Sequence, residues 1–165
     1  MAKKDLLVIE MNNKEDMECF NFREKLKIAQ KPYDYFKEIE NLNFDQLASS
    51  DRIFLQDFGI YNNELNDEEF MLRLRFPAGR ISNNSLLLIS NLAQKYNLQI
   101  ILTARAGIQL HGLDSNNILE VFNQINSQNI SSYQSFGDNI RNITSDIFDG
   151  IGVYNIIEVF PYIEQ

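Results

Sequence analysis

Residues 69–76, Glu-Phe-Met-Leu-Arg-Leu-Arg-Phe, alternate in the period-2 pattern of a β-strand. One face carries Phe70, Leu72, Leu74 and Phe76. The other face carries Met71, Arg73 and Arg75. Pro-Ala-Gly at 77–79 ends the strand. If helices cover the apolar face, the arginine face is left open for a ligand or a partner; an ordinary solvated sheet face is the alternative.

Toward the C-terminus, the sequence predicts two helices and three further strands. Ser82 is typical of an N-cap, and Asn97 of a left-handed helix stop. The buried stripe expected between them is Leu86, Ile89, Leu92, Ala93 and Tyr96. Strands are expected at 98–104 and 108–112, with a final extended piece between 130 and 143. The second helix would start at Asp114 or Ser115 and bury Ile118, Val121, Phe122 and Ile125.

The order strand–helix–strand–strand–helix–strand is that of the split βαβ, ferredoxin-like arrangement. The fold class expected is therefore α+β: a βαββαβ antiparallel sheet with helices on one face. We expect this half-domain over 66–132, a mostly helical N-terminal extension over 1–65, and the start of another domain over 133–165.

Within the extension, residues 5–10 and 52–61 read as strands and 62–67 as a loop. Residues 14–30 read as a helix that Pro32 ends, and a short helix is expected over 33–40.

Composition excludes several classes of function. The net charge is −8, from 23 acidic and 15 basic side chains, which argues against a sequence-independent nucleic-acid binder and against a polybasic membrane-surface protein. Neither a membrane-spanning run nor a signal peptide is evident, so a cytoplasmic setting is expected. The single cysteine, Cys19, excludes an intramolecular disulfide and a cysteine-clustered metal site made by this chain alone. We therefore predict no metal ligands.

The cations are unevenly distributed. Residues 1–68 hold seven of the eight lysines, and only Lys95 follows. The five later arginines are Arg73, Arg75, Arg80, Arg105 and Arg141, and the sole histidine is His111. Because a guanidinium grips carboxylates and oxyanions bidentately, this segment is a candidate anion-binding region. Chance in a small sample is the alternative.

Three motifs carry a family resemblance. Residues 70–79 (FMLRLRFPAG) resemble the M-L-R-x-R-x-P-G-G opening of the ferredoxin-like half-domain of siroheme-dependent nitrite and sulfite reductases. Residues 102–112 (LTARAGIQLHG) resemble that family's L-T-x-R-Q-x-x-Q-x-H-G. Residues 137–144 (GDNIRNIT) resemble G-D-x-x-R-N-V-T, which opens the next, cofactor-binding domain. Residues 58–61 also resemble an H-G-x-Y strand, so the resemblance covers about residues 51–152.

The resemblance implies roles for six side chains. Arg73 and Arg141 would contact the substrate anion, nitrite or sulfite. The implied cofactor contacts are Arg75, Arg105, Gln109 and His111. Arg75 is alternatively a structural partner. The complete enzyme would hold a siroheme and a 4Fe-4S cluster and would take electrons from a separate donor.

The chain also departs from the family pattern. Ile101 replaces a basic residue, Ala106 replaces a glutamine, and residues 145–151 lack the usual Cys and Pro. The cluster ligands are expected in a C-terminal, cysteine-bearing half, so this chain is expected to be an inactive N-terminal portion on its own. The alternative is a non-catalytic ferredoxin-like interaction or regulatory module. An RNA-binding module is disfavoured by the charge and by the lack of its aromatic signature.

Overall fold

The computed structural model describes residues 20–29, 35–63, 66–135, 142–145, 149 and 157–163. The chain divides into two compact units, 1–41 and 42–165. The predicted domain limits stay a prediction, and the predicted strand at 5–10 lies outside the described residues.

The first unit contains α2 (Phe22–Ala29) and the 3₁₀ helix η2 (Ile39–Asn41). Asn21 Oδ1 accepts from Glu24 N (3.0 Å), and Glu24 Oε2 accepts from Asn21 N (2.7 Å). This reciprocal capping satisfies two N–H groups at the start of α2. The earlier part of the predicted helix lies outside the described residues.

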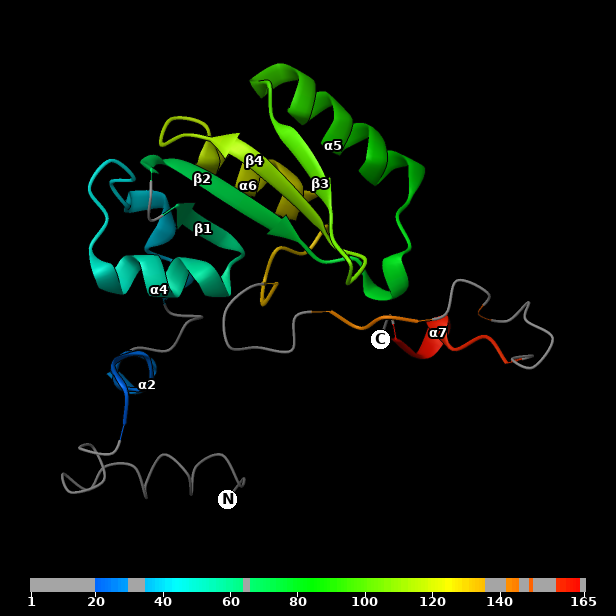
Figure 1. Ribbon diagram of the computed structural model, residues 1–165, viewed down its shortest axis with the longest axis horizontal. Helices are drawn as coiled ribbons and strands as arrows, with labels where there is room; N and C mark the ends of the chain where they lie inside the picture. The colour runs from blue at the N-terminus through cyan, green and yellow to red at the C-terminus, as the bar shows by residue number, and fades with distance from the viewer. Residues whose placement is uncertain are drawn as a thin grey trace. The chain divides into compact units, whose positions relative to one another are not determined.

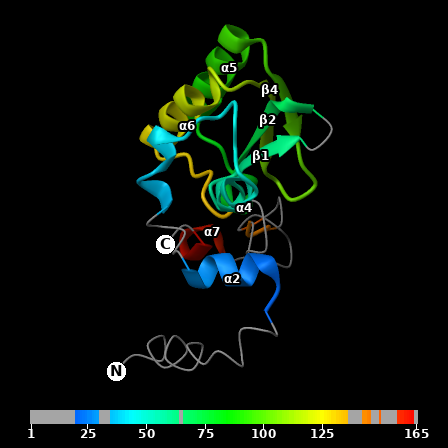
Figure 2. The ribbon, with the colours of Figure 1, turned by 90° about the vertical axis from the view of Figure 1, so that its left-hand side faces the viewer.

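The second unit is built on a four-stranded antiparallel sheet in the order β1-β2-β4-β3 (Figure 1). The strands are β1 (Ile60–Asn63), β2 (Asn66–Leu74), β3 (Gln99–Leu102) and β4 (Ile108–Leu113). The helices α5 (Asn83–Tyr96) and α6 (Ile118–Ser127) lie on the same side of this sheet (Figure 2). The predicted α+β, ferredoxin-like class is confirmed.

The core forms where the apolar face of β2 meets the helices. Phe70, Leu72 and Leu74 are each at most 1% exposed. All four side chains predicted for the inner face of α6 are buried: Ile118, Val121, Phe122 and Ile125. Successive strand residues point to opposite faces of a sheet. Arg73 and the other β2 residues that alternate with this apolar set therefore lie on the face that α5 and α6 do not cover.

The predicted ends of α5 are confirmed, and one predicted core residue is wrong. Ser82 Oγ accepts from Ser85 N (3.1 Å), and Asn97 adopts the left-handed region with φ 54°. Leu86 is 51% exposed. The buried side of α5 runs through Ile89 and Leu92, and Leu86 lies roughly 120° away from Leu92 around the helix at 100° per residue.

The start of α6 also differs from the prediction. Neither Asp114 nor Ser115 is the N-cap, because the helix begins at Ile118 after Asn117. Asp114 Oδ1 instead accepts from the N–H groups of Asn116 (2.9 Å) and Asn117 (3.0 Å). This aspartate stabilises the turn before the helix.

The strand predicted at 52–61 is wrong over most of its length. Residues 49–57 form α4 (Ser49–Asp57), and only β1 follows as strand. Asp51 Oδ2 accepts from Ala48 N (3.0 Å) at the start of the helix. The apolar run Ile53-Phe-Leu55 is too short for its periodicity to separate helix from strand. The predicted loop at 62–67 is correspondingly shorter, since β1 reaches Asn63 and β2 begins at Asn66.

The outer edge of β2 is shared by two chain segments. Gly59 O, just before β1, accepts from Arg73 N (2.8 Å), and Ser131 O accepts from Arg75 N (2.8 Å). An extended piece is predicted between 130 and 143. In the described part of that range, only Ser131 pairs with the sheet, through a single antiparallel bridge to Arg75. The fourth strand of the ferredoxin-like order is therefore replaced along most of this edge by β1.

Candidate functional site

A hollow of about 210 Å³ lies at one end of the sheet, where β2 ends and β3 turns into β4. Arg73 reaches it from β2, and Arg105 from the turn between β3 and β4. The other lining residues are Leu74, Thr103, Ala104, Gly107, Ser135 and Asn142. The structure thus brings two of the predicted site residues together.

The turn at 103–107 holds Arg105 outward. Thr103 N donates to Gly107 O (2.9 Å), and Thr103 Oγ1 accepts from Gly107 N (3.1 Å). Ala106 has φ 57°, which closes the loop tightly. With both ends of the turn tied together, Arg105 projects from its tip and is exposed.

Asn142 joins three segments at the rim of this hollow. Its Nδ2 donates to Phe76 O (2.9 Å) and to Arg105 O (2.8 Å). The next residue, Ile143, accepts from Ala78 N through its carbonyl (2.8 Å). The Asn142 side chain therefore connects the end of β2 to the turn at 103–107 that carries Arg105. Sequence reasoning missed it, although it directly follows Arg141 in the 137–144 motif.

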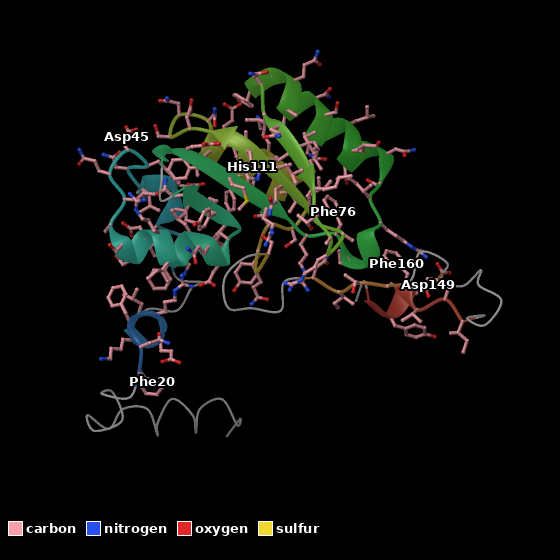
Figure 3. The ribbon with its side chains drawn as sticks, in the orientation of Figure 1. Phe20, Asp45, Phe76, His111, Asp149 and Phe160 are labelled. Carbon is pink, nitrogen blue, oxygen red and sulfur yellow. The ribbon has the colours of Figure 1, made fainter. Side chains whose placement is uncertain are left out.

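Gln109 and His111 lie on β4, beside Arg73 on the same face of the sheet. The strand register pairs Arg73 with Gln109 and Met71 with His111. The Gln109 amide lies 3.0 Å from His111 Nε2 on one side and 3.1 Å from Arg73 Nε on the other. His111 lines a second hollow of about 190 Å³ together with Tyr61, Glu69, Phe70 and Met71. Figure 3 shows His111 on the sheet face opposite α6.

Two other arginines of the described residues, Arg75 and Arg80, have different surroundings. Arg75 is half-buried, and its Nε has no hydrogen-bond partner among the described residues. Arg80 pairs with Glu158 (2.8 Å), lies 3.7 Å from Asp149, and covers the ring of Phe160 at 4.1 Å. Asp149 and Phe160 lie together in Figure 3, which places this cluster at the η3 helix (Pro77–Gly79) and α7 (Phe160–Ile163). Arg141 lies outside the described residues.

The described residues contain no cluster of three or more His, Cys, Asp or Glu side chains that could hold a metal ion. Cys19 lies outside them. In the same part of the chain, none of the helices has the length and apolar character that crossing a bilayer requires.

An antiparallel sheet backed by two helices, with arginines at the end of its uncovered face, defines a ferredoxin-like half-domain. Residues 63–128 match the family described as the nitrite/sulfite reductase ferredoxin-like half domain. The predicted resemblance to the N-terminal part of these reductases is confirmed.

Two curated relatives are ferredoxin–nitrite reductases from cyanobacteria. The enzyme of Leptolyngbya laminosa is 28% identical over 82% of this chain and 28% of its own length. That of Synechococcus elongatus is 28% identical over 89% of this chain and 30% of its own length. The hemoprotein beta-component of the NADPH sulfite reductase of Paenibacillus is 33% identical over 54% of this chain and 17% of its own. The chain thus spans less than a third of the length of these relatives.

A solved structure shares the fold. The NirA protein of Mycobacterium tuberculosis superposes with a TM-score of 0.75 at 20% identity, over 87% of this chain and 30% of its own.

Proposed function

We propose that this chain is the N-terminal portion of a siroheme-dependent nitrite or sulfite reductase and supplies the cations that hold the anion and the cofactor. The observation that supports this most directly is that Arg73 and Arg105 line one hollow on the uncovered face of the sheet. The names of the relatives support nitrite as substrate and ferredoxin as electron donor. The cytoplasmic setting stays a prediction.

The residues present fit a carboxylate-rimmed macrocycle. Siroheme carries many carboxylates, and the uncovered face offers two guanidinium groups together with His111 and Gln109. A buried, unpaired donor is costly, and Arg75 Nε is such a donor among the described residues. Arg75 would therefore gain a hydrogen bond if a cofactor carboxylate lay beside it, which supports its assignment as a cofactor contact.

In this proposal the protein positions charge, whereas the bound siroheme supplies the electron transfer. Arg73 and Arg105 keep their positive charge at any physiological pH. They can bind the oxyanion, orient its oxygens and stabilise negative charge that develops on them. Because Arg105 shares the hollow with Arg73, we propose this anion-binding role for Arg105 in addition to the cofactor contact that the resemblance implies. Arg141 is proposed to contact the same anion. Thr103 and Ser135 add hydroxyl groups to the wall of the hollow.

The 4Fe-4S cluster does not fit the residues that the structure describes, since no suitable group of ligands lies among them. We assign its ligands to a C-terminal, cysteine-bearing half of the enzyme and derive no step through it.

We expect the chain to bind nitrite or sulfite with a dissociation constant of about 1 mM at low salt. Two charge-assisted hydrogen bonds of about 1.5–3 kcal/mol each correspond to about millimolar affinity. Arg73→Ala and Arg105→Ala should each weaken binding about tenfold. The measurement is an NMR titration with the anion, monitored through the backbone amide signals of residues 103–107.

Arg80→Ala is the matched control, because Arg80 is already paired with Glu158 and does not line the hollow. Binding that persists in the Arg73→Ala/Arg105→Ala double variant would refute the anion site. Complete absence of binding by the native chain would favour the alternative of a non-catalytic interaction module.

A further expectation is that the purified chain alone is colourless and inactive. The half-domain offers contacts to one part of the cofactor only, and no group of cluster ligands lies among its described residues. The measurement is the absorption spectrum after expression in a siroheme-producing host, together with nitrite and sulfite reduction by reduced methyl viologen. A stoichiometric Soret band with turnover would contradict it.

A further inference from the structure

Gln109 lies between a permanent cation and the only histidine of the chain. The oxygen and nitrogen of a side-chain amide have nearly the same shape, so their orientation follows from their partners. A guanidinium can only donate. The Gln109 atom that faces Arg73 is therefore Oε1, which accepts from both Nε (3.1 Å) and Nη2 of Arg73.

This orientation fixes the other half of the amide. With Oε1 turned to Arg73, the NH₂ group of Gln109 faces His111 Nε2 at 3.0 Å and donates to it. A ring nitrogen that accepts a hydrogen bond carries no proton, so the proton of the neutral imidazole lies on Nδ1. Arg73 on the neighbouring strand thus determines, through Gln109, which of the two tautomers His111 adopts.

We propose that Gln109 is a positioning residue that holds the fork of Arg73 and keeps His111 in the Nδ1–H tautomer. The hydrogen-bond donor that His111 offers at the second hollow is then Nδ1–H, which suits a carboxylate or another acceptor. The consequence of this positioning role for cofactor and anion binding rests on the proposed function, whereas the assignment of the His111 tautomer does not.

The backbone supports this role. Arg73 and Gln109 are direct cross-strand partners on β2 and β4, and His111 follows Gln109 on the same face of β4. The three side chains are therefore held in one row by the sheet register and not by a loop. We call this hydrogen-bonded row of Arg73, Gln109 and His111 the relay. Because it is built on paired strands, it keeps its geometry before any ligand binds.

The chain is well suited to a direct test, because His111 is its sole histidine. Long-range ¹H–¹⁵N correlation spectra of the imidazole report which ring nitrogen carries the proton. At about pH 9 an ordinary imidazole is neutral. We expect the native chain to show the Nδ1–H pattern without any anion or cofactor present.

Two substitutions separate the two halves of the amide. In Gln109→Glu both oxygens accept, so Arg73 keeps its partner and His111 is expected to switch to the Nε2–H tautomer. In Gln109→Leu both hydrogen bonds are lost, and the ratio of Nδ1–H to Nε2–H should fall about tenfold, as expected for one hydrogen bond. Thermal unfolding of each variant confirms that the sheet is intact.

Gln99→Leu is the matched control. Gln99 pairs with His111 across β3 and β4 and is exposed, so the same change is made beside the ring without touching the relay. This variant should keep the native pattern. A native chain with Nε2–H, or a Gln109→Glu variant that retains Nδ1–H, would overturn the proposal. Because no anion is needed, failure of anion binding would bear only on the proposed function.

Discussion

Replacing Gly59 with alanine is expected to destabilise the second unit by about 3–5 kcal/mol, from a strained backbone and an overpacked site together. Gly59 has φ +80°, a region that residues with a side chain rarely adopt. An added Cβ would lie 2.5 Å from Ser132 O, 2.5 Å from Ser135 Oγ and 2.7 Å from Arg73 O. Two of these three atoms belong to backbone carbonyls, so the neighbours cannot rotate away. The melting temperature should fall by roughly 10–15 °C.

Gly112→Ala separates the two causes. Gly112 has φ +86°, but only Asn97 O lies near its added Cβ, at 3.9 Å. This control should therefore show the backbone strain alone, about 1 kcal/mol. Equal melting temperatures for the two variants would mean that steric conflict at Gly59 does not matter. Thermal unfolding by circular dichroism provides the comparison.

In a reductase assembled with a cysteine-bearing C-terminal half, Arg73→Ala is expected to lose about tenfold to a hundredfold in anion turnover. One charge-assisted hydrogen bond is worth about 1.5–3 kcal/mol, and removing a fixed donor to developing negative charge has effects of this size or larger. Arg73→Lys should recover only part, because an ammonium lacks the planar fork.

Arg80→Ala is again the control, and its turnover should stay normal. Turnover per folded molecule and the melting temperature are measured on the same samples. Normal turnover in Arg73→Ala together with a large fall in melting temperature would make Arg73 a structural residue. The same pair of measurements applies to Arg141→Ala, for which we predict a similar loss of turnover with little change in melting temperature.

The strand that carries Arg73 could be predicted because its alternation is complete. One apolar face over residues 69–76 sets the register, and a shift by one residue would have moved every side chain to the other face. Capping chemistry similarly predicted both ends of α5 at Ser82 and Asn97. By contrast, α4 could not be separated from a strand by its pattern, since its apolar run is short and its cap involves a backbone N–H of Ala48.

The candidate site could be predicted only in part. Arg73, Arg105, Gln109 and His111 stand in recognisable motifs, and the structure places them at one end and along one face of the sheet. Asn142 was missed because its contacts, Phe76 O and Arg105 O, are backbone atoms 66 and 37 positions away. Local sequence carries no signal for such a long-range contact. The same holds for Ser135, whose hydroxyl contacts Arg73 O at 2.7 Å.

The shared edge of β2 has a consequence for how the half-domain can be cut and joined. Gly59 and Ser131, the two ends of the ββαββα segment, hydrogen-bond to Arg73 and Arg75, which are two positions apart at the end of β2. Neighbouring ends of this kind allow circular permutation. The observed order, in which the edge strand comes first, is itself a permuted form of the ferredoxin-like order, in which that strand comes last. A fragment trimmed to the matched residues 63–128 would lose both segments of the edge and expose the ladder of β2 to pairing with other chains.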